Sequence, residues 1–146
     1  MAFTAVSPRF EDVCVGDELA PLEIPLTRTL IVATAMASHD YQDVHHDPTL
    51  AQQRGSKDIF MNILTTNGLV GRFVTDWAGP DAVLRKVRIR LGAPNYPGDT
   101  LCLTGAVTAK SGDDGTLEVG VQGTNSVGAH VTGTVTLTLP RQQVGA

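Results

Sequence analysis

A helical repeat of apolar residues runs through residues 62–77, with the sequence NILTTNGLVGRFVTDW. Several of these residues recur at spacings that place them near one face of a helix. They are Ile63, Leu64, Leu69, Val70 and Phe73. Gly68 and Gly71 keep part of the helix surface small, so that a sheet or another backbone can approach closely, and Gly79-Pro80 ends the repeat. The stretch therefore predicts one long helix packed against other structure.

The remainder of the chain after this helix reads as β-strand. Segments rich in Val, Thr and Leu cover residues 83–91, 100–110, 116–125 and 129–139, and turn sequences such as Pro97-Gly98-Asp99 separate them. Ahead of the helix, residues 10–26 alternate apolar and polar residues and include two prolines, which fits a turn and an edge strand. Together these features predict an α+β fold in which an antiparallel sheet wraps around one long central helix.

Composition bounds the class of protein. The 146 residues, 42% of them hydrophobic, predict one domain over residues 1–146, with residues 1–8 flexible. A net charge of −4 argues against a nucleic-acid partner. We expect no signal peptide and no membrane span, because no stretch approaches the roughly 20 apolar residues that cross a bilayer. Cys14 and Cys102 are expected to be buried, reduced thiols in a cytoplasmic protein.

Titratable residues gather in a short run between two apolar segments, at residues 38–47, SHDYQDVHHD. We expect a helix over about residues 30–38, capped by Thr29, before this run, and a short helical turn over residues 48–53 after it. Asp40, Asp43, His45 and His46 are the members of possible catalytic use. The run therefore resembles the edge of a site.

Asp40 and His45 are the preferred pair within this run. They are five residues apart, so a regular helix would separate them, but residues 41–44 contain few strong helix formers and can supply a break. A carboxylate and an imidazole that converge on one small molecule suit general acid–base catalysis. The alternative is that both are solvated loop residues. A metal site is also conceivable, but the spacing matches no closed tetrahedral set, so we expect no metal.

Other candidate residues follow from helix ends and from charge. The first N–H groups of the central helix, at Met61, Asn62 and Ile63, can stabilise a negative oxygen, although simple capping by Asn62 explains the same residues. Arg88 and Arg90 belong to the one basic cluster of the sequence, which also contains Arg72, Arg85 and Lys86. This cluster could bind the phosphates of a nucleotide handle or lie on a solvated strand face. His130 is expected to be structural or surface-exposed, and His46 an exposed neighbour of the pair.

With these motifs in place, the chain resembles the MaoC-like, R-specific enoyl-CoA hydratase family, which has the hot-dog fold. The family motif Asp-x-Asn-Pro-x-His-x-Asp matches residues 40–47 at its Asp, its His and its final Asp. The resemblance implies that Asp40 and His45 are the catalytic pair. The family sequence Ile-x-His-Gly-Met-Leu, whose glycine N–H is the oxyanion donor, corresponds to residues 59–64, which carries that backbone role to Asn62.

Departures from the family motif point to one subgroup. Gln42-Asp43 replaces Asn-Pro, Met61-Asn62 replaces His-Gly, and Asn67 stands where the family often has a serine. With residues 55–60 and 75–80, these departures resemble the small subunit of the heteromeric hydratase of bacterial steroid side-chain degradation. The resemblance makes Phe60, Met61 and Asn67 candidates for the substrate pocket.

The subgroup also implies partners and a reaction. The chain would pair with a larger MaoC-like subunit that lacks the catalytic pair and can carry an OB-like DUF35 domain, which docks a thiolase-like aldolase. The reaction expected is hydration of a steroid side-chain enoyl-CoA at ring carbon 17, without a cofactor, since the CoA thioester is the substrate. One alternative is a homodimeric R-hydratase or dehydratase acting on linear acyl thioesters, and another is a non-catalytic scaffold subunit. A thioesterase fits less well, because residues 62–75 contain no carboxylate.

Overall fold

The computed structural model describes residues 6–142. Its helices are α1 (Arg28–Ala37), α2 (Pro48–Gln53) and α3 (Ile63–Ala78), with single 3-10 turns η1 (Phe10–Asp12) and η2 (Asp43–His45). Its strands are β1 (Glu18–Pro25), β2 (Val83–Leu91), β3 (Thr100–Lys110), β4 (Thr116–Thr124) and β5 (Ala129–Thr138). The long central helix, the short helix at residue 48 and the strands after α3 are confirmed within one or two residues.

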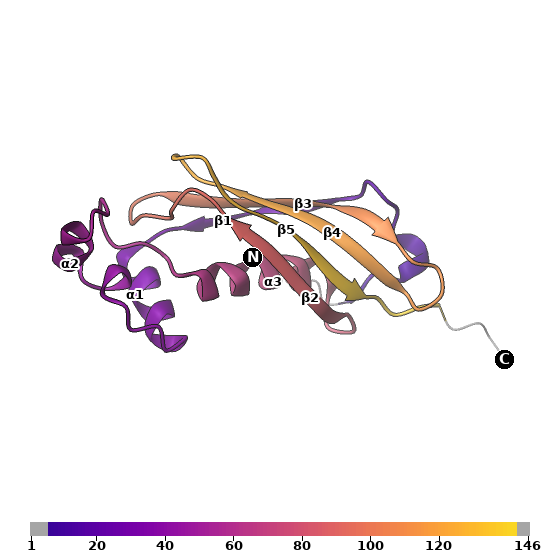
Figure 1. Ribbon diagram of the computed structural model, residues 1–146. Helices are drawn as coiled ribbons and strands as arrows, with labels where there is room; N and C mark the ends of the chain where they lie inside the picture. The colour runs from indigo at the N-terminus through magenta and orange to yellow at the C-terminus, as the bar shows by residue number, and fades with distance from the viewer. Residues whose placement is uncertain (1–5, 143–146) are drawn as a thin grey trace.

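The strands form one antiparallel sheet with the order β1-β3-β4-β5-β2, which curves over α3 (Figure 1). This is the hot-dog arrangement, and the expected fold class is confirmed. Residues of α3 such as Val70, Phe73 and Val74 are buried against the inner face of the sheet, where Leu103 and Val135 are fully covered. Helices α1 and α2 lie beyond the sheet, next to the N-terminal end of α3. The titratable run of residues 38–47 connects these two helices and therefore lies at the same end.

Two local features hold α3 in place. The Asn62 side chain accepts a hydrogen bond from the Thr65 N–H, which makes Asn62 the N-cap. At the other end, Gly79 has φ 76°, a conformation that L side chains rarely adopt, and a Cβ there would meet Ser7 Oγ at 2.7 Å. The cap at Asn62 therefore fixes the start of α3, and the left-handed backbone of Gly79 fixes its end.

Several sequence expectations need correction. Helix α1 begins two residues earlier than expected and is capped by Thr27, whose Oγ1 accepts the Leu30 N–H, rather than by Thr29. Thr27 has extended backbone angles directly after β1, which suits an N-cap. Of residues 1–8, which we expected to be flexible, residues 1–5 lie outside the described part. Ser7 is buried, and its hydroxyl accepts a hydrogen bond from the Asp81 N–H.

The expectation of two buried cysteines was wrong. Cys14 is exposed and Cys102 is half-buried, and both are free thiols. Val13 takes the core position beside Cys14, while Cys102 lies between the buried Leu101 and Leu103. Successive strand residues point to opposite faces, so Cys102 faces outward.

Across residues 6–142, the structure contains no helix that is both long and apolar enough to cross a lipid bilayer.

Candidate active site

The end of helix α1 delivers Asp40 to the site. The His39 N–H donates to the Met36 carbonyl and the Asp40 N–H donates to the Ala35 carbonyl, each at 3.0 Å. These two hydrogen bonds form a Schellman motif, which requires a residue in the left-handed region at the helix end. His39 is that residue, with φ 57°. The predicted break is therefore present, but it lies at His39 rather than within residues 41–44. The chain then turns through η2, which returns His45 toward Asp40.

Asp40 and His45 converge as predicted. Asp40 Oδ2 lies 3.4 Å from His45 Nε2, with side chains 22% and 8% exposed. His45 Nδ1 lies 2.7 Å from the Phe60 carbonyl oxygen, which can only accept, so Nδ1 carries the proton of the neutral ring. Nε2 is then an acceptor, like the carboxylate. Two acceptors at this distance do not bond directly, but one water can donate to both.

The other titratable residues of the run have different partners. Arg54 donates to both carboxylate oxygens of Asp43, at 2.7 and 2.8 Å, and these hydrogen bonds hold the pKa of Asp43 below its ordinary value. Asp47 accepts the Leu50 N–H and caps α2. His46 is exposed, as expected, with Nε2 at 3.2 Å from the Tyr41 carbonyl. Among residues 6–142, no group of three or more His, Cys, Asp or Glu side chains could hold a metal ion.

The start of α3 adjoins the pair. The backbone N–H groups of Asn62 and Ile63 have no hydrogen-bond acceptor among residues 6–142, as expected for the first turn of a helix. They are therefore free to meet an oxyanion. The Asn62 side chain also reaches the pair directly: Nδ2 donates to Asp40 Oδ2 at 3.1 Å and to Ser38 Oγ at 2.9 Å. This second contact of Asn62 was not predicted from the sequence.

The three pocket candidates are placed differently. The Phe60 ring meets the His45 ring edge-on, with centroids 5.0 Å apart, so Phe60 adjoins the pair. Met61 is buried, its N–H donates to the Asn95 carbonyl, and Asn95 Nδ2 lies 3.5 Å from its sulfur. Asn67 lies on the exposed side of α3. Phe60 is therefore the candidate with a defined ring contact to the Asp40–His45 pair.

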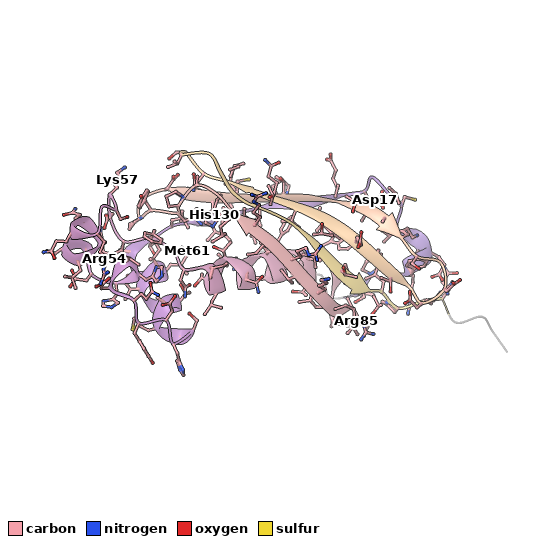
Figure 2. The ribbon with its side chains drawn as sticks, in the orientation of Figure 1. Asp17, Arg54, Lys57, Met61, Arg85 and His130 are labelled. Atoms are coloured by element: carbon pink, nitrogen blue, oxygen red, sulfur yellow. The ribbon has the colours of Figure 1, made fainter. Side chains whose placement is uncertain are left out.

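Arg88 and Arg90 are not brought to the pair. In the register of β2 with β5, Val87 faces the fully buried Val135, whereas Arg88 faces Thr134 and Arg90 faces Thr132. Because neighbouring strand residues point to opposite faces, both arginines lie on the outer face of the sheet, away from α3. Figure 2 shows Arg54 and Met61 at the end of the molecule that carries α1 and α2, with Arg85 at the far end of β2. The position of this cluster favours the alternative of a solvated strand face over phosphate binding.

His130 is structural, one of its two expected roles. It is buried over α3, with Nδ1 at 2.6 Å from the Ala93 carbonyl and Nε2 at 2.8 Å from Thr66 Oγ1 (Figure 2). The carbonyl fixes the proton on Nδ1, so the Thr66 hydroxyl donates to Nε2. Burial lowers the pKa of His130. His130 therefore links β5 to the first turn of α3.

Sequence reasoning missed Ser38, Arg54 and Asn95 as supports of the site. Ser38 meets Asn62, Arg54 anchors η2 through Asp43, and Asn95 holds the backbone of Met61. Asn62 could have been recognised as a cap from its place before an apolar helix. Its link to Ser38 spans 24 positions and leaves no local signal.

A surface depression of about 560 Å³ lies beside the pair, lined by Tyr41, Gln42, Asp43, Val44, His46 and Arg54. Neither Asp40 nor His45 lines it. The pair therefore lies next to an open surface rather than inside this depression.

Comparisons with known proteins identify the family of this chain. Residues 12–131 match the family model described as a MaoC like domain. The chain is 51% identical over 125 residues to the 3-oxo-4,17-pregnadiene-20-carboxyl-CoA hydratase beta subunit of Mycobacterium tuberculosis, covering 86% of this chain and 95% of that one.

Solved structures show the same likeness. The ChsH1-ChsH2 complex of M. tuberculosis contains a chain with 51% identity and a TM-score of 0.83, covering 86% of this chain and 98% of that one. The (R)-hydratase of A. caviae involved in PHA biosynthesis shares the fold, with a TM-score of 0.81, 20% identity, and coverage of 89% and 99%. With a family model over most of its length and a relative at 51% identity, this chain belongs to the MaoC-like domain family.

Proposed function

We propose that this chain is the catalytic subunit of an enoyl-CoA hydratase, a hydro-lyase that adds water across the α,β double bond of a steroid side-chain enoyl-CoA. The observation that carries the proposal is the Asp40–His45 pair, which presents two acceptors 3.4 Å apart beside the free N–H groups of α3. The 51% identity to a hydratase subunit supports the reaction class and the steroid substrate. No cofactor is needed, since the CoA thioester is itself the substrate.

In the first half of the reaction, a water donates one hydrogen bond to Asp40 and one to His45 Nε2. His45 takes a proton as the water oxygen bonds to the β-carbon. The Phe60 carbonyl holds the Nδ1 proton, so Nε2 is available as the base. Asp40 then faces a charged imidazolium and stabilises it.

In the second half, the double-bond electrons move to the thioester oxygen as an enolate. The Asn62 N–H and the positive end of the 16-residue α3 stabilise that oxygen. The proton held by the pair returns to the α-carbon, the enolate collapses to the thioester, and water has been added to one face of the double bond. The product is a β-hydroxyacyl-CoA, with the hydroxyl on ring carbon 17 for the steroid substrate.

We further propose that the chain works in a heteromer with a larger MaoC-like subunit that lacks the pair. Its likeness to a chain of the ChsH1-ChsH2 complex supports a partner. So does exposed apolar surface: Ile63 and Leu64 on α3 are each 52% exposed, and Leu84 on the edge strand β2 is 41% exposed. A Cβ at Gly71 of α3 would lie 3.7 Å from Leu84, so helix and strand edge are neighbours. Apolar surface beside an open strand edge favours a protein partner.

The resemblance to the steroid hydratase subgroup adds two finer proposals. The larger subunit would carry an OB-like DUF35 domain, and that domain would dock a thiolase-like aldolase. Hydration would then precede removal of the side chain by the aldolase, during bacterial steroid or cholesterol degradation.

Hydration by the purified chain, with and without the candidate larger subunit, tests these proposals. A short linear enoyl-CoA and a steroid side-chain enoyl-CoA would be offered side by side. Turnover of the steroid thioester only with the partner present is the expected result. Turnover of the linear substrate by the chain alone would instead indicate a homodimeric R-hydratase, and inactivity in every combination would indicate a scaffold.

A further inference from the structure

We propose that the side chain of Asn62 is a positioning residue for Asp40, in addition to the backbone role of its N–H. The Asn62 amide connects the helix cap to the Asp40–His45 pair. Its Oδ1 accepts the Thr65 N–H at 3.0 Å, and its Nδ2 donates to Asp40 Oδ2 at 3.1 Å. Asn62 is 1% exposed, so this amide has little water with which to exchange partners. The inference rests on the proposed hydratase function and deepens it.

Donor and acceptor counting fixes the orientation of the amide. The Ser38 hydroxyl donates to the Thr34 carbonyl at 2.8 Å, so its oxygen must accept from Asn62 at 2.9 Å. On the other side of the amide, the Thr65 N–H and hydroxyl both point at one atom of Asn62, at 3.0 and 2.5 Å. That atom must be the oxygen, because an N–H cannot accept. The NH₂ group is then directed at Ser38 and Asp40, and a flipped amide would oppose donor to donor.

The consequence for catalysis concerns one carboxylate oxygen. Asp40 Oδ2 accepts from Asn62 and also faces His45 Nε2 at 3.4 Å. Rotation of the Asp40 carboxylate would give up a hydrogen bond to a charged acceptor, which is stronger than a hydrogen bond between neutral groups. Asn62 therefore holds Oδ2 where it can orient a water and face the imidazolium. Because the same residue caps α3, the pair and the oxyanion N–H groups are held by one side chain.

A helix cap alone needs only an acceptor at residue 62, which makes the two roles separable. In Asn62→Asp the acceptor remains, since Asp caps a helix as well as Asn does. The donor is lost, and a second carboxylate faces Asp40. In Asn62→Ser the cap also remains and the donor to Asp40 is lost, but no charge is added. Gln122→Glu, an exposed position on the outer face of β4, makes the same amide-to-carboxylate change away from the pair.

The variants would be assayed in the hydratase complex over a range of pH. Asn62→Ser should lower kcat about 10- to 100-fold with little change in KM, as loss of a hydrogen bond to a charged group predicts. Asn62→Asp should lower kcat further and change the pH profile, because the donor to Asp40 is lost and a second carboxylate faces it. The exposed His39 and His46 and the Asp43–Arg54 ion pair also face this region, and none of them changes in these variants. Gln122→Glu should match wild type.

An NMR titration supplies a readout that needs no activity. The Asn62 NH₂ resonances should shift with the titration of Asp40, and this shift should disappear in Asp40→Asn. Wild-type kcat and pH profile in a stably folded Asn62→Asp variant would overturn the positioning role while leaving the hydratase proposal intact. If the Asn62 NH₂ resonances behave in the same way in wild type and in Asp40→Asn, the positioning role is overturned, even if the complex proves to be inactive as a hydratase.

Discussion

Replacing Asp40 with Asn removes one negative charge from the pair and leaves the shape of the side chain almost unchanged. The amide oxygen can still accept from Asn62 Nδ2, so the fold around Ser38 and α3 should persist. What is lost is the charge that faces His45 when its ring becomes an imidazolium. At the observed 3.4 Å and an effective dielectric constant of about 20, that attraction is worth about 5 kcal/mol.

The full value is an upper limit, because the proton is only partly transferred in the transition state and Asp40 is 22% exposed. A loss of about 3 to 5 kcal/mol corresponds to a fall in kcat of roughly 10²- to 10⁴-fold, which is also the usual contribution of a positioned acid or base. KM should change little, since the charge develops after substrate binds.

The assay follows the loss of ultraviolet absorbance of the conjugated enoyl thioester, with the partner subunit present. Asp114→Asn, in the β3–β4 turn, removes a carboxylate outside the site and should retain wild-type turnover. Thermal unfolding of each variant checks that the fold is intact. Wild-type turnover by a correctly folded Asp40→Asn variant would refute the assignment of this carboxylate.

Three further predictions concern stability and assembly. Thr66→Val leaves the buried Nε2 of His130 without its donor at 2.8 Å, so urea unfolding should show a loss of about 1 to 3 kcal/mol, and Thr66→Ser, which keeps the hydroxyl, should lose less. Burial lowers the pKa of His130 in the folded state, whereas a histidine in the unfolded chain has a pKa of about 6.5. As the pH falls through this value, the unfolded chain binds more protons than the folded chain. The unfolding free energy should therefore fall between pH 7 and 5, before the carboxylates titrate, and His130→Gln should flatten that slope; an equal slope in the variant would rule His130 out as its source. Leu64→Lys on the exposed face of α3 should weaken co-purification with the larger subunit, whereas Val127→Lys, which also changes an exposed apolar residue but in the β4–β5 turn, should not. Equal effects of the two lysines would exclude α3 from the interface.

Much of the fold follows from local patterns in the sequence. The 3.6-residue repeat of α3 and the alternation in β3, β4 and β5 locate these elements from residue order alone. The repeat did not give the buried face of α3 correctly, because Ile63 and Leu64 are each 52% exposed. The boundaries that were wrong depended on single residues: Thr27 and Thr29 are both competent caps, and only the end of β1 decides between them. Pairing of the edge strand β2 with β5, the last strand, is a long-range choice that local patterns do not contain.

The candidate site was predictable only where chemistry follows residue type. Asp40 and His45 stand out because few side chains exchange protons near neutral pH. The features that orient them are backbone groups and distant side chains. Every residue has a backbone carbonyl, so the sequence does not reveal that the carbonyl of Phe60 fixes the His45 tautomer. Ser38 pairs with Asn62 across 24 positions. For Arg88 and Arg90, residue type was misleading. Their positive charge suggested phosphate binding, but both side chains lie on the outer face of the sheet.

The segment from Phe60 to Asn62 shows why the pair and the helix start should vary together. The Phe60 N–H donates to the Val44 carbonyl and its own carbonyl accepts from His45, which ties this segment to η2. The Met61 N–H ties it to Asn95, and Asn62 ties it to Asp40. Each residue thus connects the start of α3 to a different neighbour. A partner that covers the exposed Ile63 and Leu64 would therefore lie on the helix end that these hydrogen bonds connect to the pair.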